Sequence, residues 1–355
     1  MAEAGGSFSL FCDVAGNVWG CGRNSQHLGF NSARIFYSPI QLSVSNVEFI
    51  SAGEYHSLFL DSNGDSWSCG LGIYGQLGIS YATLDEYYAT KITKIELPKV
   101  KAIKACPFHS MFIDIDDYVW SCGENDCNKL GFKGRNTRLP LKVTDLPPIA
   151  SVCGGSHHSM FLDTNGVVWG CGKNDHHQVI FDFPGLCVQD VTQVPNVPRM
   201  KSIAAGFHHT VFLDENGSVW VCGHNKFGQL GIDPDKSKMR QVEDLPPIQS
   251  IHAGSYQTCL VDTSGNVWAA GKITKDLFPQ ATTFTKIQHL PPITAASVQR
   301  HALFTDTSGD VWGLGGNQYG ELGLGNTVTA CTTATQIPSM NVRTRPLTRT
   351  KSARS

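Results

Sequence analysis

Residues 206–231 read GFHHTVFLDENGSVWVCGHNKFGQLG, and close copies of this stretch recur along the whole chain. Each copy has an aspartate followed six residues later by a tryptophan, as in Asp214 and Trp220. All seven tryptophans occupy this place: Trp19, Trp67, Trp120, Trp169, Trp220, Trp268 and Trp312. The steps between them are 48, 53, 49, 51, 48 and 44 residues. A fixed period of this size, with no tryptophan left over, predicts a repeat architecture of seven units.

Each repeat unit predicts four short β-strands. An apolar run follows a Gly-x-x-His phrase, and a second run with the tryptophan follows a turn that reads Asn-Gly in three units. Asn-Gly between two such runs predicts a hairpin, because both residues accept positive φ. The third unit has Asp116-Asp117 instead, a poorer turn. Two further strands, joined by a Pro-containing bend, complete about 49 residues. The sequence therefore predicts an all-β fold, a seven-bladed β-propeller of four-stranded antiparallel blades, with the tryptophans in its core.

The two ends of the chain predict how the ring closes. The first unit lacks the strand that precedes the Gly-x-x-His phrase in the other units, whereas the last unit has a surplus strand over residues 334–342. We expect this C-terminal strand to complete the N-terminal blade, because a closed ring leaves few exposed strand edges. The predicted organisation is a single propeller over residues 1–342 and a disordered basic tail over residues 343–355.

Composition and cysteine placement exclude several classes of protein. No apolar run approaches the ~20 residues of a membrane helix, and the N-terminus lacks the pattern of a signal peptide. Of the twelve cysteines, five lie two residues after a repeat tryptophan, where the last two units have Ala270 and Leu314. We interpret these as small apolar core positions and expect no cysteine bridges. No C-x-x-C is present, and many free thiols indicate the cytoplasm or the nucleus and not secretion.

Residues 5–342 resemble the regulator of chromosome condensation (RCC1) family of seven-bladed propellers. The resemblance rests on Gly-x-x-His-Ser/Thr, Asp-x-x-Gly-x-Val-Trp, Gly-x-Asn and Gln-Leu-Gly, which recur in this order. It implies a docking disc. In the founding members one face acts as guanine-nucleotide exchange factor for the small GTPase Ran and the other meets chromatin. Other members are protein-binding modules, and exchange by such proteins needs no metal or cofactor.

The resemblance also implies that partner contacts cluster around the Gly-x-x-His turns. The only acidic residue in these turns is Glu54, and His157 and His208 directly precede two of the repeated histidines. These three residues and the repeated histidines are partner-binding candidates, and the histidines among them would titrate near neutral pH. The alternative is that each repeated histidine caps its own blade by a hydrogen bond to backbone. The repeated histidines are His56, His109, His158, His209 and His301, and the first unit has Phe8 in their place.

Departures from the repeat are further candidates for a specific contact. The longest step between tryptophans contains Tyr81, Tyr87 and Tyr88, with two acidic residues among them. Aromatic and acidic side chains on one loop favour a protein contact, and a loosely packed loop is the alternative. Adjacent histidines do not predict a metal site, because they point apart in a strand. Gly70, Gly72 and Gly75 match the dinucleotide fingerprint, but no helix follows them.

The charge distribution separates the tail from the propeller. The chain has a formal net charge of −2, and the segment 343–355 has five basic residues and no acidic one. The rest is therefore mildly acidic, which argues against DNA binding by the propeller itself. The basic tail suits a contact with nucleic acid, an acidic protein or import machinery.

We expect no catalytic residue, cofactor, metal, membrane contact or small-molecule substrate. The predicted function is a protein-interaction propeller that binds a protein partner such as a small GTPase through one face. The alternative is an active guanine-nucleotide exchange factor for a Ran-like small GTPase.

Overall fold

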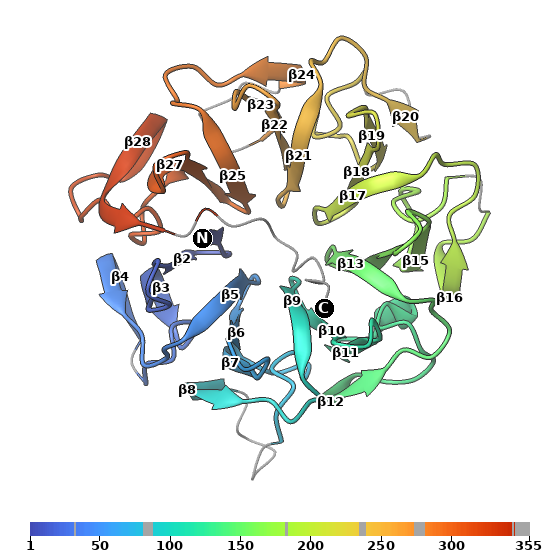
Figure 1. Cartoon of the computed structure of the whole chain (residues 1–355), viewed down its shortest axis with the longest axis horizontal. Helices are drawn as coiled ribbons and strands as arrows, with labels where there is room; N and C mark the ends of the chain where they lie inside the picture. The colour runs from blue at the N-terminus through green and yellow to red at the C-terminus, as the bar shows by residue number, and fades with distance from the viewer. Residues whose placement is uncertain are drawn as a thin grey trace, which may run out of the picture.

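A computed structural model describes residues 1–31, 33–80, 88–181, 184–233, 239–272, 281–342 and Thr344. The described strands form seven separate four-stranded antiparallel sheets. Figure 1 shows them as blades around a central opening, with the N-terminal and C-terminal blades side by side. The predicted seven-bladed propeller is confirmed. The predicted basic tail lies outside the described residues, except for Thr344.

Each blade uses four consecutive strands, ordered from the central opening to the rim (Figure 1). The inner strands are β1 (Ala2–Ala4), β5 (Val47–Ala52), β9 (Val100–Ala105), β13 (Ile149–Gly154), β17 (Met200–Ala205), β21 (Ile248–Ala253) and β25 (Ile293–Val298). The second strands are β2 (Phe8–Cys12), β6 (His56–Asp61), β10 (His109–Asp114), β14 (His158–Asp163), β18 (His209–Asp214), β22 (Gln257–Asp262) and β26 (His301–Asp306). We number the blades 1 to 7 in this order.

The third and fourth strands complete the blades. The third strands are β3 (Val18–Ser25), β7 (Ser66–Leu71), β11 (Val119–Gly123), β15 (Val168–Lys173), β19 (Val219–Gly223), β23 (Val267–Gly271) and β27 (Asp310–Gly316). The rim strands are β4 (Ala33–Gln41), β8 (Tyr88–Lys94), β12 (Thr137–Lys142), β16 (Cys187–Gln193), β20 (Arg240–Gln241), β24 (Ala281–Lys286) and β28 (Ala330–Asn341). A short 3-10 helix, η1 (Asp126–Asn128), follows β11.

The second strand of each blade is buried along its length. In β14, for example, all six residues are buried. The usual alternation of buried and exposed residues is absent because both faces of the blade pack against neighbouring blades. Six blades place a phenylalanine with no exposed surface in this strand: Phe11, Phe59, Phe112, Phe161, Phe212 and Phe304. Burial of this apolar strand on both sides holds the ring together.

The Asp-to-Trp spacing locks the hairpin between the second and third strands. In blade 6 the Asp262 carboxylate accepts one bond from the Trp268 indole at 3.1 Å and two bonds, both at 2.9 Å, from backbone N–H groups of the turn. The same indole bond, between 2.9 and 3.4 Å, is present in all seven blades. The tryptophans are half-buried and not fully buried as expected, because the indole edge meets a carboxylate close to the surface.

The hairpin turns follow the sequence prediction. Gly64, Gly166 and Gly217 have φ of +81°, +80° and +84° at the three Asn-Gly turns. In the third unit Asp117 adopts φ of +72° at this position, a conformation that a side chain makes costly. This confirms the poorer turn expected there.

The predicted ring closure is wrong in its strands. Blade 1 has its own inner strand β1, which pairs with β2 through Ala2 and Phe11. The surplus C-terminal segment is part of β28, the rim strand of blade 7. Among the described residues, the backbone pairing between the C-terminal segment and blade 1 is an isolated bridge between Asp13 and Val342. The residues Ala2–Ala4 are enough for a short strand, but they lack the Ile and Val residues that mark the inner strands of the other units.

The expectation that the cysteines form no bridge is wrong for one pair. Ten cysteines are buried and free, whereas Cys127 and Cys187 form a disulfide. Cys127 lies in η1 of blade 3, and Cys187 begins β16 of blade 4. Neither lies at the repeat position two residues after a tryptophan, so the sequence period says nothing about their proximity.

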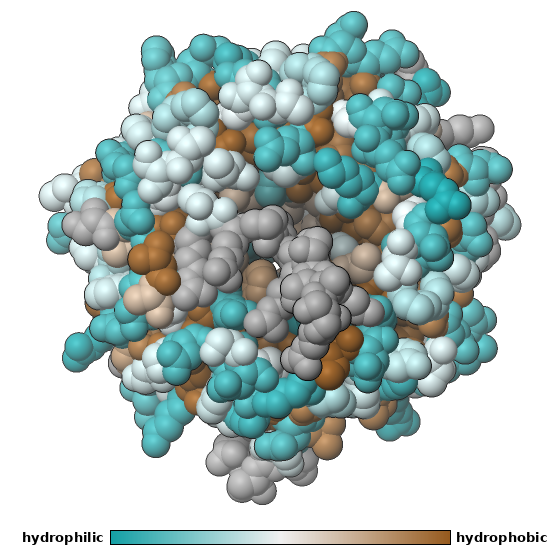
Figure 2. Space-filling model, in the orientation of Figure 1, coloured by the Kyte–Doolittle hydropathy of each residue, from teal (hydrophilic) through white to brown (hydrophobic). Residues whose placement is uncertain are grey.

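The face of the disc shown in Figure 2 is mostly hydrophilic, with hydrophobic side chains in smaller patches between hydrophilic ones. Among the described residues, no helix is long and apolar enough to cross a membrane.

Candidate functional site

Each blade contributes a turn and a loop to the same side of the disc. The turn, with the Gly-x-x-His phrase, joins the first and second strands, and the loop joins the third and fourth strands. Consecutive antiparallel strands place both connections on one side. We call this side the histidine-turn face and the opposite side, with the Asp–Trp hairpins, the hairpin face.

The repeated histidines lie between blades and offer no surface to a partner. All five are buried, with at most 1% of their surface exposed. In each, Nε2 contacts a serine or threonine hydroxyl of the following blade at 2.7 to 3.1 Å. The pairs are His56–Ser110, His109–Ser159, His158–Thr210, His209–Thr258 and His301–Ser9. The expected alternative, a cap on backbone of the same blade, is replaced by a side-chain bond to the next blade.

The direction of these bonds follows from the hydroxyl groups. The Ser110 hydroxyl donates its only proton to the Gln76 carbonyl at 2.6 Å, so the His56 Nε2–H must donate to Ser110. Burial lowers the pKa of His56 to about 3 and that of His301 to about 3. These imidazoles are therefore neutral at physiological pH, and they act as ties between blades.

Glu54 forms an ion pair on the histidine-turn face. Its side chain is 3% exposed and pairs with Arg300 of blade 7, which is 55% exposed. Burial raises the pKa of the Glu54 carboxyl, and the nearby Arg300 guanidinium lowers it in part. The pair spans the turn of blade 1, where Gly6 contacts Glu54 and has no side chain to obstruct it. Arg300, not Glu54, is the exposed partner of this pair.

A row of half-buried aromatic rings lies on the histidine-turn face. Tyr55 lies 6.3 Å from Phe108 between ring centroids, Phe108 lies 6.2 Å from His157, and His157 stacks on His208 at 6.0 Å. All are half-buried. Three further half-buried rings continue the row, with Tyr256 at 5.7 Å from Phe207 and 5.0 Å from Phe227. We call these rings the aromatic belt: Tyr55, Phe108, His157, Phe207, His208, Phe227 and Tyr256.

Of the aromatic belt, only His157 and His208 were predicted from the sequence. Tyr55, Phe108 and Tyr256 stand directly before the repeated position and carry no charge. An aromatic residue at the same place in several units was the signal for a continuous apolar surface.

A buried lysine supports the belt below His157. Lys129 is fully buried, pairs with Glu124 and donates to the Ser156 carbonyl at 2.7 Å. Burial lowers the pKa of the Lys129 ammonium, and Glu124 opposes this effect. The ammonium also lies 5.7 Å from the Phe108 ring centroid. This polar group fixes the loop of blade 3 under the belt.

The loop with Tyr81, Tyr87 and Tyr88 is not part of the aromatic belt in the residues that the structure describes. Tyr88 begins the rim strand β8 and is 47% exposed. Tyr81 and Tyr87 lie outside the described residues.

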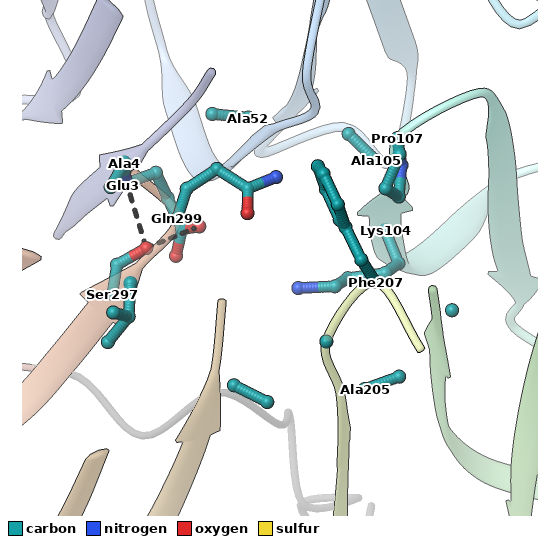
Figure 3. Close-up of a pocket in the computed structure, with 14 residues that line it drawn as sticks. Glu3, Ala4, Ala52, Lys104, Ala105, Pro107, Ala205, Phe207, Ser297 and Gln299 are labelled. Atoms are coloured by element: carbon teal, nitrogen blue, oxygen red, sulfur yellow. Dashed lines mark hydrogen bonds between the residues drawn. The ribbon is translucent and has the colours of Figure 1, made fainter. Parts of the chain in front are cut away.

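The central opening contains a small pocket between the inner strands. Its volume is about 40 Å³. Figure 3 shows Glu3 and Lys104 on opposite sides of it, and Phe207 and Gln299 among the other residues that line it. Nucleotide-sized ligands need about 300–1,000 Å³. This pocket is too small for them. A larger pocket of about 690 Å³ lies between blades 1 and 7, away from the aromatic belt, which is the candidate site for a protein partner.

Comparison with known families identifies the repeat. Two models, both described as Regulator of chromosome condensation (RCC1) repeat, match residues 47–76, 149–178 and 200–229, and residues 116–162 and 216–261. The chain contains RCC1 repeats and folds as a seven-bladed propeller, and the resemblance seen in the sequence is confirmed to that extent.

Individual relatives agree with this class. The chain is 30% identical over 236 residues to "Guanine nucleotide exchange factor SRM1" of Saccharomyces cerevisiae, a match that covers 63% of this chain and 41% of that protein. It is 30% identical over 251 residues to the human "Probable E3 ubiquitin-protein ligase HERC6", covering 67% of this chain and 24% of that protein. The chain thus spans less than half the length of these curated relatives.

Solved structures show the same fold. Prp20p of Saccharomyces cerevisiae, described with its binding properties to Gsp1p and histones, has a TM-score of 0.81 at 22% identity, over 93% of this chain and 88% of that one. Human WBSCR16 has a TM-score of 0.77 at 20% identity, over 86% and 87%.

Proposed function

We propose that residues 1–342 form one docking module that binds a small GTPase through the aromatic belt of the histidine-turn face. The observation that carries this proposal is the continuity of the belt. Five adjacent blades, 2 to 6, contribute at least one half-buried ring to it.

Aromatic side chains are enriched in the cores of protein interfaces, because they add contact area at low cost in conformational entropy. The belt is also held rigidly from below, since each of its turns is tied to the next blade by a buried histidine or, at Gln257, by a hydrogen bond from the side-chain NH2 to the Gln299 carbonyl. A preorganised surface loses less entropy on binding.

The relatives support the class of partner. One is described as a guanine nucleotide exchange factor, and Prp20p is described with binding to Gsp1p. A small GTPase is therefore the first partner to test.

Active nucleotide exchange on a Ran-like GTPase is the second candidate, favoured by the description of SRM1. Exchange requires that the module bind the nucleotide-free GTPase more tightly than the loaded form. Two acids near the belt, Glu54 and Glu124, are engaged by Arg300 and Lys129. Binding without strong exchange is for this reason the first proposal.

The test combines binding and exchange assays. Ran and a panel of other small GTPases are immobilised in nucleotide-free and loaded forms, and binding of the whole chain is measured by biolayer interferometry. Release of fluorescent GDP is followed in parallel. Tyr256→Ala removes the ring that blade 6 contributes to the belt. Its matched control is Tyr118→Ala, at a 44% exposed tyrosine on the hairpin face.

We expect Tyr256→Ala to weaken binding at least tenfold, as expected for a hot-spot aromatic residue, and Tyr118→Ala to change it less than twofold. Equal effects of Tyr256→Ala and Tyr118→Ala on binding would show that the GTPase does not bind at the aromatic belt. Absence of binding to every GTPase in either form would refute the partner class. Accelerated release of GDP that is lost in Tyr256→Ala would establish the second candidate.

A further inference from the structure

Three histidines from two neighbouring blades meet at the edge of the aromatic belt. His176 is in the loop of blade 4, His208 in the turn of blade 5 and His224 in the loop of blade 5. Their ring centroids form a triangle with sides of 4.7 Å (His176–His224), 6.0 Å (His176–His208) and 6.3 Å (His208–His224). The rings are inclined to one another by 58° to 74° and are all half-buried.

This triangle is close to the size that one metal ion needs. Imidazole nitrogens bind Zn²⁺ at about 2.0–2.1 Å, which places the centroids of three rings around one tetrahedral ion about 5 Å apart. Two sides of the triangle exceed this value by about 1 Å. Rotation of the three half-buried rings is therefore required to bring their nitrogen atoms onto one ion.

We propose that His176, His208 and His224 bind a single divalent transition-metal ion of the class that prefers imidazole, represented by Zn²⁺, Ni²⁺ and Co²⁺. This site shares His208 with the aromatic belt, but metal binding does not require the proposed GTPase contact. Nitrogen ligands of this kind suit these metals and not Mg²⁺ or Ca²⁺. With three protein ligands, the ion retains a position for water.

The nitrogen atoms of the triangle include one without any other role. His208 Nδ1 is buried and has no hydrogen-bond partner among the described residues. His224 Nδ1 accepts a hydrogen bond from the Gln229 side-chain NH2 at 3.0 Å, so the ring proton is on Nε2. The Gln229 oxygen accepts from the Phe227 N–H at 3.1 Å, which fixes the orientation of this amide. An ion at His224 therefore binds Nδ1 and replaces the Gln229 hydrogen bond there.

A carboxylate next to the triangle supplies negative charge. Asp175 accepts a bond from Gln178 at 3.2 Å and pairs with Lys173 at 2.8 Å, so it is oriented on the chain that carries His176. Its charge acts on both His208 and His224. Outer carboxylates of this kind orient and strengthen histidine ligands.

The triangle also has an entry path. A pocket of about 300 Å³ lies between the loops of blades 4 and 5, and its lining includes Asp175, His176 and His224. It is large enough for an ion that still carries several waters.

A neighbouring group of oxygen and nitrogen atoms is a weaker alternative. Glu124, Asp126 and His157 bring one ligand atom each within 4.8 Å of one another. The Glu124 oxygen that faces His157 is the same one that pairs with the buried Lys129 ammonium. A cation is thus already present at this carboxylate, and a second one is opposed by its charge.

The test uses the whole chain, freed of metal with a chelator and titrated with Co²⁺ alone. We expect one equivalent of Co²⁺ to give visible d–d absorption without the intense near-ultraviolet bands of thiolate ligands. Zn²⁺ should displace it one to one. The absence of thiolate bands distinguishes the triangle from the cysteines. Titration calorimetry with Ni²⁺ gives the affinity independently.

We expect His176→Ala and His224→Ala each to weaken metal binding at least tenfold. The matched control is His289→Asn, at an exposed histidine on the hairpin face whose positive φ asparagine tolerates. Thermal unfolding of each metal-free variant checks its fold. No binding by the parent chain would overturn the proposal. So would loss of binding in His157→Ala with retention in His176→Ala, which would assign the ion to the Glu124 group. Neither result depends on any GTPase, so failure here leaves the proposed function untouched.

Discussion

Lowering the pH from 7 to 5.5 is expected to reduce the free energy of unfolding by up to about 6 kcal/mol, because the five inter-blade histidines stay neutral in the fold. Burial lowers the pKa of His56, His158, His209 and His301 to about 3, and lowers that of His109 well below its usual value. The unfolded chain takes up these protons near pH 6.5.

The sign and size follow from this difference. A group with a lowered folded pKa stabilises the fold fully above its unfolded pKa and loses this contribution as the pH falls towards the folded pKa. Each histidine costs about 1.4 kcal/mol per pH unit below 6.5, or about 1.2 kcal/mol between pH 7 and 5.5. The buried carboxyls of Glu3 and Glu54 act in the opposite direction, because their pKa values are raised.

One substitution isolates a single histidine from this sum. His56→Phe gives blade 2 the residue that blade 1 has at this position, Phe8. Beside Phe8, the Ser57 hydroxyl of the next blade keeps its hydrogen bond to the His27 carbonyl at 2.6 Å, so we expect Ser110 to keep its own bond in the variant. The variant loses one neutral hydrogen bond, about 1 kcal/mol at pH 7. It also loses one titrating group, so its stability should fall about 1.2 kcal/mol less than that of the parent chain by pH 5.5.

The assay is urea unfolding followed by tryptophan fluorescence at four values between pH 5.5 and 7.5. The curves of free energy against pH should converge as the pH falls. Parallel curves would show that His56 titrates alike in the folded and unfolded chains, and the assignment of a neutral, buried tie would then be refuted.

Three further changes test other parts of the structure. Asp262→Ala removes the acceptor of one indole and two backbone N–H groups and should cost about 2–4 kcal/mol in urea unfolding, whereas an effect below 0.5 kcal/mol would contradict the hairpin lock. Lys129→Met leaves Glu124 buried without its partner and should cost about 3–5 kcal/mol, and recovery of stability in the double variant with Glu124→Gln is the control. Intact-mass analysis of the unreduced protein should show one disulfide, between Cys127 and Cys187, that is absent in Cys187→Ser. Loss of this bridge, which spans 60 residues, should lower the free energy of unfolding by up to about 4 kcal/mol. Twelve free thiols in the parent chain would contradict the bridge.

The sequence alone determined the number of blades and the hairpins within them. Seven Asp–Trp phrases at a near-constant period specify seven units, and Asn-Gly turns specify where neighbouring strands pair. These features were predictable because hairpin pairing is local, with partners a few residues apart such as Phe212 and Trp220.

The candidate site was only partly predictable. The period identified the histidine turns but not the direction of their side chains. The period therefore could not distinguish the buried His158 from the half-buried His157, because the two residues are adjacent and of the same type. In the structure the first is a tie between blades and the second is part of the belt.

The tertiary structure decided every contact between blades. It brought Arg300 to Glu54 across 246 residues, and it gathered His176, His208 and His224 into one triangle. The physical reason is that backbone pairing within a blade depends on neighbours in sequence, whereas contacts around the ring depend on which side chains adjacent blades present to each other. A repeat pattern states where such positions fall, and only packing around the closed ring states what they meet.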